Sequence, residues 1–189
     1  SDEFTNLENR IKVTTDTTEQ FDKALKGIKK SALDSRSDLE ATAKLYQRIA
    51  INSKDLGISQ KDILRTADAV AKSLKVSGAS ATEATSSLTQ FAQAIGAGTL
   101  QGEELRSTLE NNAVLSKAIA SALGKSVGDL RKMGETGQLT ATRVLRAILS
   151  QADGIDAKFK KMGVTYQDAF MNLGTATRVM LNNVSKAFF

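Results

Sequence analysis

The stretch that decides the fold runs from Ser77 to Thr140 and reads SGASATEATSSLTQFAQAIGAGTLQGEELRSTLENNAVLSKAIASALGKSVGDLRKMGETGQLT. Short amphipathic segments alternate in it with turns that contain glycine. Apolar residues recur at steps of three and four, which is the period of a helix, and several segments begin near a residue that can cap one. The stretch therefore predicts a series of short helices joined by tight turns.

The helical pattern continues on both sides. We expect helices at about 102–110, 113–123 and 127–133, a longer one from about 141 and a last one from about 166. The chain has no proline, so none of its 189 residues is barred from a helix by a missing N–H. The sequence predicts an all-α fold. We expect residues 1–163 to form a compact, irregular domain of about eight or nine helices, and residues 164–189 to form a C-terminal amphipathic helix that begins a longer helical region of the parent protein.

Helix starts repeat one pattern, in which a polar side chain accepts a bond from an exposed backbone N–H and an acid or amide follows three residues later. The pattern predicts caps at Thr5 with Glu8, Thr17 with Gln20, Ser37 with Glu40 and Ser80 with Glu83, and weaker ones at Ser59 with Asp62, Ser126 with Asp129 and Thr165 with Asp168. Glycine in a left-handed conformation closes many helices. Such ends are predicted at Gly57, Gly78, Gly96, Gly124 and Gly163.

Four blocks of the chain, in this order, resemble a known family. They are SGASATEA from Ser77, GAGTLQGEELRSTLE from Gly96, AIASALGKSVGDLRKM from Ala118 and GQLTA from Gly137. In these blocks, and outward from about Thr5 to about Leu181, the chain is similar to the folded tape-measure domain of long-tailed bacteriophages and their prophages. The resemblance implies a segment of a tail length tape measure protein, which is a structural protein and not an enzyme.

The resemblance also implies a location and partners. The full protein would lie in the tail lumen, and in the host cytoplasm during assembly, where it sets tail length before it leaves with the DNA at infection. Its partners would be tail tube, tail tip or initiation complex, or tail chaperone proteins, and it would need no cofactor. An α-helix rises only 1.5 Å per residue, so compact helices measure length poorly. We therefore expect this domain to be a folded docking module, with the ruler in other regions.

Composition removes much of the usual chemistry. The chain has no cysteine and no histidine, so it offers no disulfide, lacks the two best zinc ligands and cannot form a Ser-His or Cys-His nucleophile. We expect no metal and no catalytic residue. No apolar run approaches the roughly 18 residues of a membrane span, so no membrane contact is expected within this segment.

Almost all of the net charge of +5 lies in the last fifty residues, where residues 141–189 hold seven basic and three acidic side chains. Lys158, Lys160 and Lys161 beside Phe159 come closest to a nucleic-acid pattern, which interleaves basic and aromatic residues. A solvated helix end is favoured there, because cations stabilise a helix C-terminus. Nucleic-acid binding is therefore unlikely within this segment, and a weak DNA-contacting module stays an alternative.

A muralytic, peptidoglycan-degrading module is the other alternative, since some phage tail proteins degrade peptidoglycan. Its candidate acids are Glu103 and Glu104, but adjacent helix residues do not face each other across a cleft. Both acids also suit the first turn of a helix. Gly96, Gly98 and Gly102 imitate a phosphate-binding loop without the strand that it requires, and Gly124-Lys125-Ser126 lacks the earlier glycine of a P-loop. We interpret both glycine motifs as helix caps and turns.

Two departures from the family pattern carry expectations. Asn111-Asn112 stands where the family has a proline, and an asparagine side chain can make the same turn by bonding to the backbone. Asp153-Gly154 falls where relatives continue a helix, so we expect a kink or an end there.

One surface is a candidate protein-interaction site. Its apolar residues step by four and three alternately, which is the spacing of a coiled-coil seam. We expect this stripe to drive self-association through the C-terminal helix, with packing onto its own domain as the alternative. Its main residues are Tyr166, Phe170, Leu173, Met180 and Val184, with Thr177 and Ala187 in register.

Overall fold

The computed structural model describes residues 2–162, 173–181 and 183. Among them it contains the nine labelled α-helices, one short 3-10 helix, η1, and a further helical segment at residues 173–181, but no β-strand, which confirms the all-α prediction. The elements are α1 (Asp2–Lys12), α2 (Thr18–Asp34), α3 (Leu39–Ser53), η1 (Lys54–Leu56), α4 (Gln60–Val76), α5 (Ala81–Ala97), α6 (Gly102–Asn111), α7 (Ala113–Leu123), α8 (Val127–Glu135) and α9 (Ala141–Lys160).

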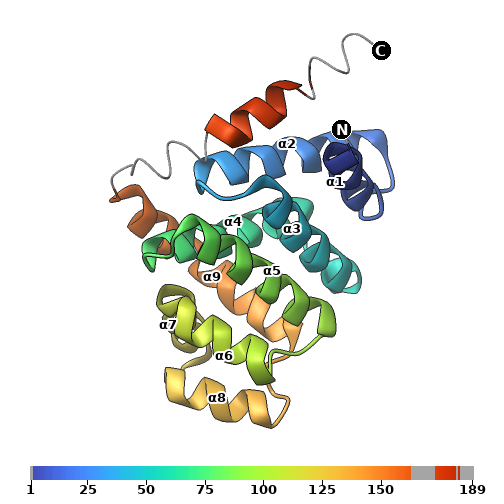
Figure 1. The fold of residues 1–189 in the computed structure, drawn as a ribbon. Helices are drawn as coiled ribbons and strands as arrows, with labels where there is room; N and C mark the ends of the chain where they lie inside the picture. The colour runs from blue at the N-terminus through green and yellow to red at the C-terminus, as the bar shows by residue number, and fades with distance from the viewer. Residues whose placement is uncertain (1, 163–172, 182, 184–189) are drawn as a thin grey trace.

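The helices form two ends joined by a middle layer (Figure 1). α1 and α2 lie at one end, and the short helices α6, α7 and α8 lie at the other. The middle layer consists of α3, α4, α5 and α9. In it, α9 packs along α4 and also contacts α7, while α3 packs along α5. The chain thus returns through its own centre in α9, so residues far apart in sequence share one core.

The core is rich in alanine, which lets helices approach closely. Ala67 and Ala71 on α4 are buried, as are Val144 and Ile148 on the facing helix α9. A second contact of this kind joins α2 to α4, where a Cβ added at Gly27 would lie 2.5 Å from Cδ1 of Leu64. Small residues therefore set the spacing between the central helices, as close packing requires.

A backbone clasp joins the two connections that flank the end formed by α6, α7 and α8. Leu100 N donates to Leu139 O at 2.8 Å, and Ala141 N donates to Gly98 O at 2.8 Å, around an antiparallel bridge between Thr99 and Thr140. The clasp brings together two of the family blocks, which lie almost forty residues apart in the chain. These blocks therefore have a structural role, because they tie the connection between α5 and α6 to the connection between α8 and α9.

Most predicted helix caps are present. The side chain of Thr17 accepts from Gln20 N, that of Ser59 from Asp62 N, that of Ser80 from Glu83 N and that of Ser126 from Asp129 N, and the last two are full capping boxes. Gly57 and Gly124 are left-handed C-caps, and Gly78 also has a positive φ. The pair Thr165 and Asp168 and the end at Gly163 lie outside the described residues.

Three predicted helix boundaries are wrong. Thr5 lies inside α1, which begins at Asp2, because the acids Asp2 and Glu3 already suit its first turn. The cap of α3 is Asp38 rather than Ser37, whose side chain is buried in the preceding turn. Gly96 lies within α5, and the left-handed residue that closes the helix is Gly98, at φ 87°.

The two departures from the family pattern have opposite outcomes. Asn112 does make the turn between α6 and α7, since its side chain accepts from Leu115 N at 3.1 Å. Asp153-Gly154, in contrast, does not end its helix, since α9 continues from Ala141 to Lys160. Asp153 is held there by an ion pair with Arg65 of α4, which joins the two long central helices.

Candidate functional site

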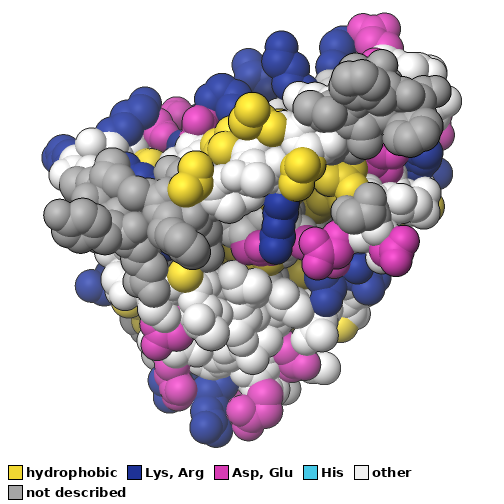
Figure 2. Space-filling model, turned by 45° about the horizontal axis from the view of Figure 1, so that its top comes forward, with side chains coloured by type: hydrophobic (Ala, Val, Ile, Leu, Met, Phe, Trp, Pro, Cys, Tyr) yellow, Lys and Arg dark blue, Asp and Glu magenta, His cyan; other side chains and the backbone are white. Residues whose placement is uncertain are grey.

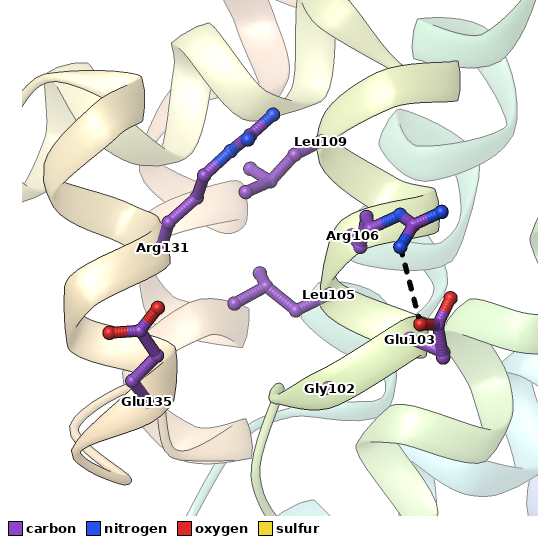
Figure 3. A pocket seen from close by; sticks show the side chains of 7 residues that line it. All are labelled: Gly102, Glu103, Leu105, Arg106, Leu109, Arg131 and Glu135. Atoms are coloured by element: carbon purple, nitrogen blue, oxygen red, sulfur yellow. Dashed lines mark hydrogen bonds and ion pairs between the residues drawn. The ribbon is translucent and has the colours of Figure 1, made fainter.

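A groove lies between α6 and α8, at the end of the fold formed by the short helices (Figure 3). It has a volume of about 320 Å³ and is lined by Gly102, Glu103, Leu105, Arg106, Leu109, Arg131 and Glu135. Its width depends on Gly134 of α8, where an added Cβ would lie 2.1 Å from Cδ2 of Leu105 and 3.3 Å from the carbonyl oxygen of Leu100. The missing side chain lets α8 approach α6 closely enough to form the groove.

The groove has an apolar floor and charged walls. Leu105 and Leu109 form the floor and are 5% and 7% exposed. On the α6 wall, the Arg106 guanidinium pairs with Glu103 at 3.4 Å and with Glu110 at 3.5 Å. An arrangement of this kind, apolar in the centre with polar groups at the edge, is typical of protein-binding surfaces.

The α8 wall carries two charges that have no ion-pair partner within the described part of the chain. Arg131 and Glu135 are one helical turn apart, yet their side chains do not meet. Figure 3 shows Arg131 extended toward Leu109, whereas Glu135 lies at the other end of the groove, beyond Leu105. The base comes before the acid in this pair. An ion pair between residues four apart in a helix is weaker in that order than when the acid comes first, which agrees with the two side chains lying apart. The groove therefore presents a guanidinium near Leu109 and a carboxylate near Leu105.

The acids proposed for a glycosidase do not form a catalytic pair. Glu103 and Glu104 occupy the first turn of α6, as predicted, and both are exposed. Glu103 turns toward Arg106 and away from Glu135 on the other wall (Figure 3). A glycosidase needs two carboxylates facing one bond, with the pKa of one raised by burial, and these exposed acids lack that environment.

The glycine motifs act as helix ends. Gly98 closes α5 and Gly102 begins α6 with φ values of 87° and 56°, and a helix rather than a strand precedes them. Gly124 closes α7, and Ser126 caps α8 two residues later. The predicted helix end and helix cap between α7 and α8 are therefore present, and the motif Gly124-Lys125-Ser126 does not form a phosphate-binding loop.

Two members of the basic cluster near the end of α9, Phe159 and Lys160, belong to a structural network. Phe159 is buried beneath two cations, with the Arg36 guanidinium 4.8 Å and the Lys72 ammonium 5.4 Å from its ring centre, so the ring is not free to stack on a base. Lys72 also binds Asp156 at 2.5 Å and Asp68 at 2.7 Å, and Lys160 binds Asp156 at 2.7 Å. This network joins α4 to α9.

The charges of this network shift one another's pKa. Burial of the Lys72 ammonium opposes its charged form, but hydrogen bonds to Asp156 and Asp68 outweigh that effect and raise its pKa above the usual range. Hydrogen bonds from Lys160 and Lys72 lower the pKa of Asp156. Both groups are therefore charged at neutral pH, and their role in the fold is structural.

The predicted interaction stripe lies partly in the described residues. Residues 173–181 and 183 are helical and lie above α2 (Figure 1). One face packs on the domain, since Thr175 is buried, Val179 contacts the core and Arg178 pairs with Asp38 at 3.4 Å.

Another face of this segment is exposed. Leu173 and Met180 of the stripe, and the neighbouring Leu181, are 64%, 66% and 65% exposed. Figure 2 shows hydrophobic side chains gathered on the face of the molecule that carries this segment. Tyr166, Phe170 and Val184 lie outside the described residues.

The described residues contain neither a membrane-spanning helix nor a cluster of metal ligands. No described helix is long and apolar enough to cross a membrane. In the same part of the chain, no group of three or more carboxylates is placed to hold a metal ion.

Comparisons with known proteins give one match. A family model described as "Tape measure protein" matches residues 1–186, which is nearly the whole chain. No curated protein and no solved structure matches the chain.

Proposed function

The chain belongs to the tape measure protein family, a structural component of bacteriophage tails, and on this premise we propose that it acts in tail assembly as a folded docking module. Through the protein that contains it, the module serves tail length determination and DNA ejection. It works by protein–protein contacts and carries no catalytic step. The observation that carries the proposal is the family match over residues 1–186.

The shape of the domain supports docking rather than measuring. Its longest described helix, α9, has 20 residues and therefore spans about 30 Å. The other helices are folded back on one another, so the domain adds little length for the residues that it contains. The ruler is expected in extended helices of the same protein, and this domain is expected to fix one part of that protein in the tail lumen.

Two surfaces are available for contacts with other tail proteins. One is the groove between α6 and α8, and the other is the exposed stripe on the C-terminal segment. The stripe includes Leu173 and Met180, with Tyr166, Phe170 and Val184 in the same register of the sequence. Large apolar side chains contribute roughly 1.5–3 kcal/mol each when they become fully buried, so covering this stripe favours a partner or a second copy.

The proposal is tested with purified components. The domain is mixed with the tail tube protein, the tail tip or initiation complex and the tail chaperone of one phage, and binding is measured by calorimetry. Saturable binding to at least one of these supports a docking module. Absence of binding to all of them, together with clearing of purified peptidoglycan by the domain, would replace the proposal with the muralytic alternative.

A further inference from the structure

The guanidinium of Arg131 is the most distinctive group in the groove between α6 and α8. Arg106, on the other wall, is already paired with Glu103 and Glu110. Arg131 has no such pair among the described residues, and it lies alongside Leu109 rather than beside the carboxylate of Glu135 (Figure 3). An arginine offers five donors in a rigid fork that suits a carboxylate, and a partner's carboxylate is therefore the ligand that it fits.

The floor beneath Arg131 requires an apolar ligand. Leu105 and Leu109 are buried at the bottom of the groove, and the small part of each side chain that the groove exposes is apolar. A volume of about 320 Å³ is at the lower end of the range for binding pockets, so it suits one or two side chains of a partner rather than a large ligand. An apolar side chain inserted there would be covered on both sides by charged walls.

The charges define the order of groups in the partner. Arg131 lies near Leu109 and Glu135 near Leu105, so the α8 wall is positive at one end of the floor and negative at the other (Figure 3). A ligand that matches it carries an acid on one side of its apolar anchor and a base or a neutral group on the other side. Such matching of charges contributes mainly to the choice and orientation of a partner.

We propose that this groove binds a short segment of another tail protein in which an apolar anchor side chain is flanked by an acidic residue. The anchor rests on Leu105 and Leu109, and the carboxylate binds the guanidinium of Arg131. The assignment rests on the proposed docking role of the domain, and it names the chemistry of the partner that this role requires.

The experiment selects ligands without assuming their source. A library of random twelve-residue peptides is selected for binding to the intact chain, and the selected peptides are synthesised. Their affinities are measured for the wild type, for Arg131→Glu and for the matched control Lys132→Glu. Both variants change the net charge by the same amount at exposed neighbouring positions of α8, but only position 131 lines the groove.

The proposal expects a consensus with Asp or Glu at a fixed spacing from Leu, Ile, Met or Phe. Arg131→Glu should weaken binding at least tenfold, Lys132→Glu should change it less than threefold, and the peptide should shift the methyl resonances of Leu105 and Leu109. A selection that yields no such consensus, or peptides that bind Arg131→Glu as well as the wild type, would overturn the proposal.

A second measurement separates this proposal from the proposed function. Phage that carry Arg131→Glu in the parent gene should form fewer complete tails than phage that carry Lys132→Glu. If both variants assemble normal tails while loss of the whole domain blocks assembly, the groove proposal fails and the docking role stands. If loss of the domain has no effect on tails, the docking role itself fails.

Discussion

Gly134 on α8 packs directly against Leu105 on α6, so that a Cβ at position 134 would lie 2.1 Å from Cδ2 of the leucine. Leu105 is buried, and the backbone oxygen of Leu100 lies 3.3 Å from the same point. The oxygen belongs to the backbone, which cannot shift as readily as the end of a side chain can. The contact therefore fixes the distance between the two helices that form the groove.

Changing Gly134 to Ala is expected to destabilise the domain. Forcing a methyl group into a packed contact typically costs about 1–3 kcal/mol, and the gain of about 1 kcal/mol from replacing glycine in a helix offsets only part of it. The control is Gly128→Ala in the same helix, where the nearest atom to the added Cβ is Ser126 Oγ at 3.7 Å. Chemical denaturation measures both variants, and equal stability of the two would contradict the packing argument.

Asn112 is expected to contribute more to stability than its neighbour Asn111. Its side chain is buried, donates to Ser73 Oγ at 2.8 Å, accepts from Ser77 Oγ at 3.1 Å and caps α7. Asn112→Ala leaves buried polar groups without partners, at a cost of about 1–3 kcal/mol, and removes a cap worth about 1 kcal/mol. Asn111→Ala loses one exposed bond and is expected to change stability by less than about 0.5 kcal/mol. Thermal unfolding compares the two.

The sequence predicts the helices well because the signals that define them are local. Capping residues such as Ser80 and Ser126 act on backbone groups three residues away, and apolar spacing identifies the buried face, so the order of α2 to α9 follows from the chain alone. Gly96 and Gly98 give the same local signal for a helix end, and the sequence does not show which of them closes α5. The sequence also gives no sign of the ion pair between Asp153 of α9 and Arg65 of α4, because the two residues lie far apart in the chain.

The groove was not predicted, because it exists only through contacts between α6 and α8. Arg131 and Glu135 look like ordinary solvated charges in the sequence, and their separation from each other becomes visible only with Leu105 and Leu109 beneath them. Gly134 gives no signal either, because it directly follows the helix predicted at 127–133, whereas α8 extends to Glu135 and places this glycine against Leu105. The stripe on the C-terminal segment, in contrast, was predicted from spacing and stays a prediction.

Acid is expected to weaken the network between α4 and α9. The folded state lowers the pKa of Asp156, so this carboxylate stabilises the domain above its unfolded pKa of about 3.9, and the contribution is lost as the pH falls through the lower folded pKa. Asp156→Asn should therefore be less stable than the wild type at pH 7, and the difference should shrink below about pH 4. A difference that stays constant from pH 7 to pH 2.5 would contradict this role.

Self-association is expected to depend on the exposed stripe. Met180→Glu places a charge on the seam without touching the face that packs on the domain, since that face carries Thr175 and Val179. The variant should sediment as a monomer at concentrations where the wild type forms dimers or larger species. Gln93→Glu adds the same charge at an exposed position of α5 and should behave as the wild type does. A wild-type chain that stays monomeric at high concentration would contradict the prediction.

The central claim is that this domain docks and does not measure, and electron microscopy of phage tails tests it most directly. The region that encodes the 189 residues is removed in frame from the gene of the parent protein, and the number and length of assembled tails are recorded. If the domain docks the protein during assembly, complete tails should be lost or become rare. Tails assembled in normal number, shorter by the roughly 280 Å that 189 residues span as one continuous helix, would contradict the claim.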